Sequence, residues 1–415
     1  MNPLMNVDGW LTSKRLRAHG LLLGIAVWSV YIWTLSTPTL RDRNGNLKGT
    51  DFLHFYTLGT LALERRGGDL YDMNAQAALA ARRVPNAAGI RYLPLYPPQV
   101  SILFAPFAHL SYAWALALWW VCTGSIYGLC CYRIWRAYPN LHDYGGTVAI
   151  LAAASPAFFH LIAWGQTSAL ALGCFTLAFF FLRDRREFLA GLVLGCLIFK
   201  PQLGLACAIV LVAVGAWKII AGALLSSAAQ ILAAILYYGT GPLRVWIQTI
   251  LNVRMQLPYF EPRVYQTYCL RTFWAMIIPW SGVSFALYLI SAALILGLTI
   301  AVWRSSERDS LPLKYAVLLF ATVLISPHLT VYDLVILAPA FLFLADWLLS
   351  GQVRGGRGMG TLLYLAYMLP LFVPFTRWTH VQLTVVVMVV LVWMIWKVAR
   401  PARSSPLPQL AEQER

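Results

Sequence analysis

The sequence predicts an all-α, polytopic membrane protein, and three observations support this fold class. Hydrophobic residues make up 60% of the 415 residues and charged residues only 12%, whereas a soluble chain would be about a quarter charged. Apolar runs follow one another along the chain and are separated by short basic segments, as expected for helices that cross a bilayer and for their loops. The 17 Trp and 20 Tyr residues suit a chain with many membrane–water interfaces.

The apolar runs are the predicted membrane helices, about twelve in number. They fall at residues 21–37, 112–134, 145–162, 167–183, 188–199, 203–217, 219–238, 283–303, 314–327, 331–349, 361–375 and 380–398. Several are short, and "FKPQ" (199–202) interrupts the region 188–217. Because Pro201 removes a backbone donor and Lys200 is costly at mid-membrane, we expect this break at a membrane face.

The distribution of Lys and Arg predicts that both termini are cytoplasmic. A cytoplasmic N-terminus (1–20), a single transmembrane domain (21–399) and a cytoplasmic tail (400–415) are expected. The first helix, 21–37, is expected to be retained, because no small-residue cleavage site follows it. Two large external loops, 38–110 and 239–281, belong to the domain, and the first should contain amphipathic helices that lie in the interface. This pattern predicts a multi-pass protein of the plasma membrane, such as the bacterial inner membrane. An active site would then lie on the periplasmic, external face.

Composition also excludes several classes of function. The net charge of +16 is spread over short loops between apolar runs, so we expect membrane lipids and no nucleic acid as partners. Almost all of the seven Cys lie inside apolar runs, which argues against a disulfide framework and against a Cys metal site. The segment "DLYD" (69–72) lacks the spacing of an Asp-x-Asp metal motif. No metal or other cofactor is therefore predicted.

Unusual polar residues gather on the predicted external side. The segment "GTDFLHFYTLGTLALERRGGDLYD" (49–72) holds five ionisable residues of interest, namely Asp51, His54, Glu64, Asp69 and Asp72. Four of them are acidic, in a chain that has only 16 acidic residues. The loop 239–281 carries four Arg residues against the positive-inside trend, namely Arg244, Arg254, Arg263 and Arg271. These Arg residues fit either an anionic ligand or anchors to lipid headgroups.

Several of these motifs resemble glycosyltransferase family 87, a family of polyprenol-phosphate-mannose-dependent mannosyltransferases. The motifs are "GTDFLHFY" with "GGDLYD", then "YPPQVSILFAPFAHLSYAWALALWW", the stretch from "WGQTS" to "FKPQ", and "SPHLTVYDLVILAPA". The resemblance spans most of residues 45–345 and is strongest at Asp51, Tyr96-Pro97-Pro98, Gly165-Gln166 and Lys200-Pro201. It implies a GT-C fold and transfer of a sugar from a lipid monophosphate to an acceptor hydroxyl, on the external face and with inversion.

The acceptor proton must leave as the glycosidic bond forms, which calls for a general base. Asp51 is the first candidate, because the resemblance places the family's essential Asp at this position. Asp51 is also well placed to cap a helix beginning at Phe52. His328 is a second candidate, either as the base or as an acceptor-binding residue, because a histidine side chain is suited to proton transfer near neutral pH. The sequence does not choose between Asp51 and His328.

The leaving phosphate calls for positive groups, and the candidates are Lys200, Arg254, Arg263 and Arg271. Lys200 could instead anchor a short helix by extending its ammonium to the interface. Three further residues are candidates for binding the sugar or the acceptor: His54, Gln166 and Tyr96. His54 lies one helical turn after Asp51, Gln166 could equally serve a turn, and Tyr96 with its two prolines also has a purely structural interpretation.

The predicted function is transfer of a hexose, most specifically mannose, from a polyprenyl-phosphate sugar to a lipid-anchored or polymeric glycan. One alternative is a transporter or flippase of a lipid-linked sugar, which would spread polar residues along a path to both faces. Another is an O-antigen ligase-like or polymerase-like enzyme, which would use a lipid pyrophosphate donor.

Overall fold

The computed structural model describes residues 10–252, 263–305, 311–351 and 358–399. Over these residues the chain is helical, and its only β-type pairings are isolated bridges joining Arg41 to Leu47 and Thr267 to Thr330. The predicted all-α class is therefore confirmed. The apolar runs of the sequence coincide with helices because uninterrupted hydrogen bonding within a helix satisfies the backbone where water is absent.

Each predicted apolar run overlaps one helix or two consecutive ones. The helices are α1 (Ser13–Leu35), α5 (Tyr112–Ala137), α6 (Gly145–Ala153), α7 (Pro156–Trp164), α8 (Ser168–Arg183), α9 (Glu187–Gly195), α10 (Pro201–Ala213), α11 (Trp217–Tyr238), α15 (Ser281–Arg304), α16 (Leu311–Ile325), α17 (Ala338–Leu349), α18 (Met359–Met368), α19 (Val373–Thr379) and α20 (Leu383–Val398). Short 3₁₀-helices join or extend several of them, including η6 (Cys196–Phe199) before α10 and η9 (Val331–Leu337) before α17.

The count of about twelve spans is not confirmed. Among the described residues, 5 helices are long and apolar enough to cross a membrane, or up to 7 if two bent pairs each form one span. One bent pair joins Pro139–Ala153 to Pro156–Trp164 at 45°, so the run predicted as a single helix at 145–162 is broken. Six further apolar helices have only 10–17 residues, fewer than the roughly 20 that a bilayer core requires. One of them, α16, is buried along most of its length, which explains why it is apolar on every face.

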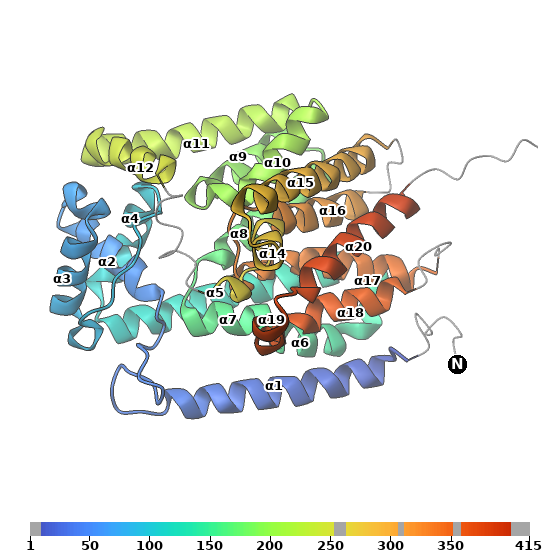
Figure 1. Cartoon of the computed structure of the whole chain (residues 1–415), viewed down its shortest axis with the longest axis horizontal. Coiled ribbons are helices and arrows are strands. Elements are labelled where there is room, and N and C mark those ends of the chain that lie inside the picture. Colours follow the sequence, from blue (N-terminus) through green and yellow to red (C-terminus); the bar gives the residue numbers. More distant parts are fainter. Residues whose placement is uncertain (1–9, 253–262, 306–310, 352–357, 400–415) are drawn as a thin grey trace, which may run out of the picture.

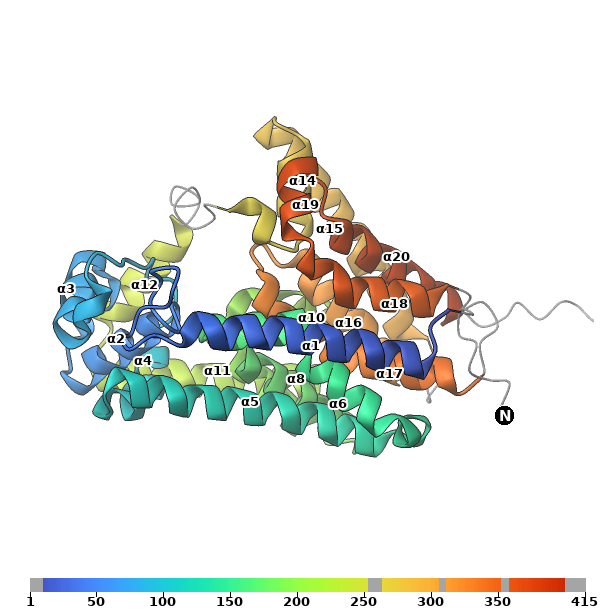
Figure 2. The same ribbon diagram turned by 90° about the horizontal axis from the view of Figure 1, so that it is seen from below.

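The helices form one bundle with a helical cap at one end (Figure 1). The cap contains α2 (Phe52–Leu63), α3 (Met73–Arg83), α4 (Gln99–Phe104) and α12 (Gly241–Leu251). Helix α1 lies along one face of the bundle (Figure 2) and contacts α6 where Gly20 leaves room, since a Cβ there would lie 2.8 Å from Ile150 Cγ2. The start of α1 lies at the end opposite the cap, where the side chain of Trp10 donates a hydrogen bond to Thr361 (3.1 Å).

The first external loop was expected to contain amphipathic helices that lie in the interface, and α2 is not one of them. Every residue of α2 from Phe52 to Ala62 is buried, so this helix has no solvent face. It packs closely on α4, and a Cβ at Gly59 would lie 2.3 Å from the Phe104 carbonyl oxygen. Helix α3 has the expected amphipathic character, because it buries Gln76, Leu79 and Ala80 and leaves its Arg residues on the surface. The cap therefore fixes α2 as part of the protein core and places the partly buried Asp51 at its edge.

Candidate active site

Asp51 precedes α2 and is held from a distant part of the chain. It occupies the N-cap position, but its side chain makes no capping hydrogen bond. Its carboxylate oxygen Oδ2 instead accepts a hydrogen bond from Gln166 Nε2 (2.6 Å). The backbone N–H of Asp51 donates to the Trp164 carbonyl (2.9 Å), which fixes the same pair of segments together. The capping interpretation of Asp51 is therefore wrong for its side chain.

Gln166 is placed by a tight turn at the end of α7. Gly165 ends that helix with φ +68, a left-handed conformation that favours glycine. A Cβ at Gly165 would also lie 2.7 Å from Phe52 Cβ, so the turn rests directly on the first residue of α2. Trp119 donates from its indole to the Gly165 carbonyl (3.0 Å). Gln166 is buried, and its Oε1 accepts from the Thr167 backbone N–H (3.3 Å), which orients the amide toward Asp51.

A second polar group is formed around Ser168, two residues after Gln166, by Lys200 and Asp333. Lys200 is buried, and its ammonium forms an ion pair with Asp333 Oδ1 (2.6 Å) and donates to Ser168 Oγ (3.1 Å). Ser168 in turn donates to the same Asp333 oxygen (2.5 Å). The other oxygen of Asp333 accepts from the backbone N–H (3.2 Å) and the hydroxyl (3.4 Å) of Thr330. Buried charges of this kind need both a counter-ion and further hydrogen bonds, and Asp333 has both.

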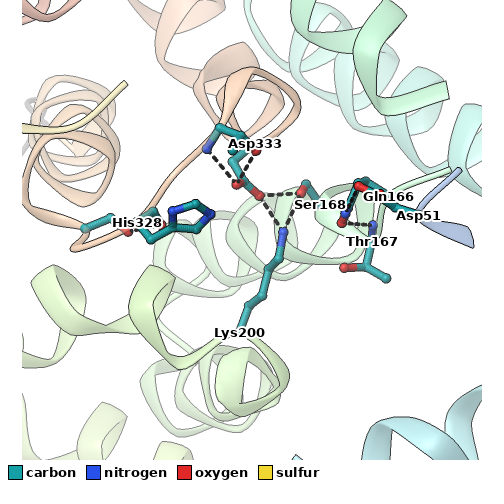
Figure 3. Close-up of polar contacts among 9 residues, drawn as sticks. Asp51, Gln166, Thr167, Ser168, Lys200, His328 and Asp333 are labelled. Atoms are coloured by element: carbon teal, nitrogen blue, oxygen red, sulfur yellow. Dashed lines mark hydrogen bonds and ion pairs between the residues drawn. The ribbon is translucent and has the colours of Figure 1, made fainter. Parts of the chain in front are cut away.

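The segment 166–168, at the start of α8, therefore joins two carboxylates (Figure 3). Gln166 holds Asp51, whereas Ser168 holds Asp333 and Lys200. The N-terminus of α8 contributes a positive electrostatic potential at this point. One short turn thus brings together residues from the start of α2, from the break before α10 and from η9.

The protonation of Asp51 reflects this environment. Burial raises the pKa of Asp51 above its ordinary value, to about 6, and the charge of Asp333 acts in the same direction. The hydrogen bond from Gln166 and the charge of Lys200 oppose this rise. A carboxyl with a pKa near 6 is ionised at neutral pH and is a stronger base than an ordinary Asp, which suits general base catalysis.

His54 lies among aromatic rings, whereas Tyr96 also borders the polar group. Burial raises the pKa of Tyr96 above its ordinary value, the charge of Lys200 opposes this rise, and the charge of Asp333 adds to it. The His54 ring packs against Tyr92 (5.2 Å between centroids) and Tyr96 (5.8 Å). Neither ring nitrogen of His54 has a hydrogen-bond partner of good geometry among the described residues, although Gln76 lies near enough to raise its pKa slightly. Burial lowers the pKa of His54 to about 4, so the ring is neutral. The backbone N–H of His54 donates to the Asp51 carbonyl (3.1 Å), but among the described residues no hydrogen bond joins the two side chains.

His328 lies in the loop between α16 and η9, where its carbonyl accepts from the Ser326 hydroxyl (2.8 Å). In Figure 3 its ring points toward the pair formed by Lys200 and Asp333. The same loop is paired with the later part of the second predicted external loop (239–281). Tyr268 donates its N–H to the Leu329 carbonyl (2.9 Å), and the Arg271 guanidinium donates to the Pro327 carbonyl.

The Arg candidates thus separate. Arg271 is attached to the loop that holds His328, whereas Arg263 is exposed at the start of a 3₁₀ turn, η7 (Val264–Gln266). Arg254 lies outside the described residues. The structure therefore brings Asp51, Gln166 and Lys200 into one group and places His328 and Arg271 together beside it.

The residue that the sequence interpretation missed is Asp333. It belongs to the quoted motif "SPHLTVYD", and a carboxylate entering the apolar run "LVILAPA" is a recognisable signal, since an ionisable residue in such a run needs a partner. Ser168 carries no comparable signal, because an isolated serine at a helix start is common. Among the residues the structure describes, no group of three or more His, Cys, Asp or Glu side chains is arranged to hold a metal ion.

Comparison with known proteins finds one family. The model of glycosyltransferase family 87 matches residues 95–327, more than half of the chain. The matched region contains Tyr96, Gln166 and Lys200, whereas Asp51 precedes it and His328 and Asp333 follow it. No curated protein and no solved structure matches the chain.

Proposed function

This chain belongs to glycosyltransferase family 87, and from that premise we propose which sugar, donor and face a membrane glycosyltransferase of this structure uses. It transfers a hexose, mannose in our proposal, from a polyprenyl monophosphate to a hydroxyl group of a lipid-anchored or polymeric glycan. The reaction takes place on the external face and inverts the anomeric centre. The observation that carries the proposal is the hydrogen bond by which Gln166 holds a partly buried Asp51, whose pKa is raised, beside Lys200.

Asp51 is the general base in this proposal. Gln166 occupies its Oδ2, and no side chain of the described residues is seen to bond to Oδ1, which is the atom that accepts the acceptor's hydroxyl proton. As that O–H bond breaks, the acceptor oxygen forms the new bond to the anomeric carbon. The bond from that carbon to the phosphate oxygen breaks at the same time, and the lipid phosphate leaves with the electron pair.

Lys200 stabilises the leaving phosphate in this proposal. An ammonium group has three donors, and Lys200 uses two of them for Asp333 and Ser168. The third is directed to the phosphate, whose charge the N-terminus of α8 also stabilises. Arg271 donates to the carbonyl of Pro327, the residue before His328. Arg271 and His328 provide further polar groups for the phosphate or the acceptor. No metal ion is required for these steps.

The donor is tested by transfer from radiolabelled lipid-linked sugars in membranes that contain the protein or the empty vector. We expect label from polyprenyl-phosphate-mannose to enter a glycan only where the protein is present, and label from a nucleotide-linked mannose not to enter it when synthesis of the lipid-linked form is blocked. Label from a polyprenyl pyrophosphate sugar, and not from the monophosphate, would instead identify a ligase-like or polymerase-like enzyme.

A further inference from the structure

A cavity beside α17 has no role in the reaction proposed above. It has a volume of about 250 Å³ and lies between the start of α1 and helices α6, α17 and α18. It extends along η9 and α17 from Leu334 to Leu349, and its wall is predominantly apolar. None of Asp51, Lys200 or Asp333 lines it.

Two tyrosine side chains in the wall use their hydroxyl groups in hydrogen bonds to backbone carbonyls. Tyr127 donates its hydroxyl proton to the Ala152 carbonyl (3.1 Å), and Tyr367 donates to the Leu151 carbonyl (2.9 Å). Both rings therefore present apolar surface to the cavity. A cavity of this character does not hold water well, because water needs two to four polar partners. It suits a hydrocarbon chain, which restores the dispersion contacts that an empty space lacks.

The start of α1 forms one end of the cavity, which we call its basic mouth. Ser13 and Leu16 line it, and the neighbouring residues Lys14, Arg15 and Arg17 are exposed. Arg17 Nε donates to Thr147 Oγ1 (2.7 Å), and Thr147 is itself a lining residue. In the described part of the chain, none of the three basic residues forms a salt bridge with an acidic side chain. An apolar cavity with an unneutralised basic mouth is complementary to an amphipathic anion.

We propose that this cavity binds one anionic glycerophospholipid. An acyl chain occupies the apolar space along α17, and the phosphate lies against Lys14 and Arg17. Basic pockets between membrane helices bind anionic headgroups by this combination of charge and hydrocarbon. The lipid would fill the space between α1 and the bundle, and so would hold α1, which is otherwise mostly exposed.

The position of the charges favours a phospholipid over the isoprenoid donor. The donor's phosphate is assigned to Lys200, close to the start of η9, whereas the basic mouth lies near the far end of α17. The 12 residues of α17 alone separate these points by roughly 18 Å at 1.5 Å per residue. One phosphate cannot satisfy both, so the lipid at the basic mouth is a second molecule.

The test uses the full-length protein, purified in mild detergent and examined by native mass spectrometry. After delipidation, phosphatidylglycerol or phosphatidylcholine of matched chain length is added back. We expect one phosphatidylglycerol to bind to the wild type, and its affinity to fall by about tenfold or more in Lys14→Gln/Arg17→Gln. Lys218→Gln, which removes an exposed lysine at the start of α11, should bind as the wild type does.

A cavity variant tests the hydrocarbon part independently. Ala345 lines the cavity, and Ala345→Phe should reduce phosphatidylglycerol binding without touching a charge. Equal binding of the two phospholipids, or unchanged binding in Lys14→Gln/Arg17→Gln, would overturn the proposal. So would a retained lipid identified as polyprenyl phosphate whose binding is lost in Lys200→Met. Sugar transfer is measured on the same preparations, so failure of the lipid site and failure of the transferase proposal are distinguishable.

Discussion

Gln166 and Asp51 are 115 positions apart in the chain, and a hydrogen bond of 2.6 Å from the amide to the carboxylate joins them. The bond has two consequences for Asp51. It leaves one carboxylate oxygen available, and it limits the rise in pKa that burial imposes on this residue. Gln166 therefore serves to orient and tune the proposed base. Its amide contacts Asp51 in this structure, whereas a sugar hydroxyl was the partner expected from the sequence.

The pH dependence of transfer follows from the pKa of Asp51. Because that pKa is raised to about 6, Asp51 is ionised above this pH and protonated below it. We expect the transfer rate to be constant on the neutral side and to fall about tenfold per pH unit well below 6. Initial rates between pH 4.5 and 8 at saturating donor measure this dependence. A rate that stays constant down to pH 4.5 would contradict the assignment of Asp51.

Replacement of Gln166 should shift this profile. The hydrogen bond from Gln166 lowers the pKa of Asp51, so Gln166→Ala should move the acidic limb to higher pH. The rate at neutral pH should also fall by roughly 10- to 100-fold, because the carboxylate loses its orientation. Gln166→Glu introduces a second carboxyl and should move the limb further in the same direction. An acidic limb unchanged in both variants would show that Gln166 does not act on the base.

The ion pair of Lys200 with Asp333 should behave as one unit. Both side chains are buried, so Lys200→Met or Asp333→Leu alone leaves an uncompensated charge, at a cost of about 3–5 kcal/mol in the free energy of unfolding. The double variant should recover much of that stability while remaining inactive, because no ammonium is left for the phosphate. Thermal unfolding in detergent and transfer assays on the four proteins separate the two effects. Activity in the stable double variant would remove Lys200 from the phosphate site.

The turn at Gly165 should tolerate no side chain. Gly165→Ala places a Cβ 2.7 Å from that of Phe52 and keeps φ at +68, a conformation that costs an L-residue about 1–2 kcal/mol before any clash. We expect lower stability and a transfer rate reduced with it, since both Gln166 and the start of α2 must move. Gly68→Ala is the matched control, because a Cβ at Gly68 would meet nothing within 4 Å. Equal melting temperatures for the two variants would contradict the close packing of this turn.

The sequence was sufficient to predict where the helices lie, but it did not predict how many of them are long enough to span a membrane. Apolar runs predicted where helices lie, because burial and bilayer both demand continuous apolar residues. They did not separate a span from a short buried helix such as α16, whose residues are apolar because other helices surround it. The bend between α6 and α7 lies at Ala154 and Ser155, directly before Pro156. The continuous apolar run 145–162 gave no sign of this break.

Site residues were predicted where they stand out chemically. Asp51 and Lys200 are ionisable residues that stand out in a chain with few charges, and the structure places them in one group with Gln166. Their partners could not be read from the sequence, since Asp333 lies 133 positions from Lys200 and only the packing of η9 on α7 and α8 brings it near. The same limit applies to Asp51, whose capping role was the simpler expectation from local sequence.

The central claim is that Asp51 acts as the base in sugar transfer, and Asp51→Asn tests it most directly. Asn keeps the size of the side chain and can still hydrogen-bond Gln166, but it cannot take a proton at neutral pH. Asp72→Asn is the matched control, because Asp72 caps α3 and Asn caps equally well. Transfer of labelled mannose from polyprenyl-phosphate-mannose is measured in membranes with equal amounts of each protein. The account predicts a loss of at least about 100-fold for Asp51→Asn and wild-type transfer for Asp72→Asn. Undiminished transfer by a folded Asp51→Asn protein would contradict it.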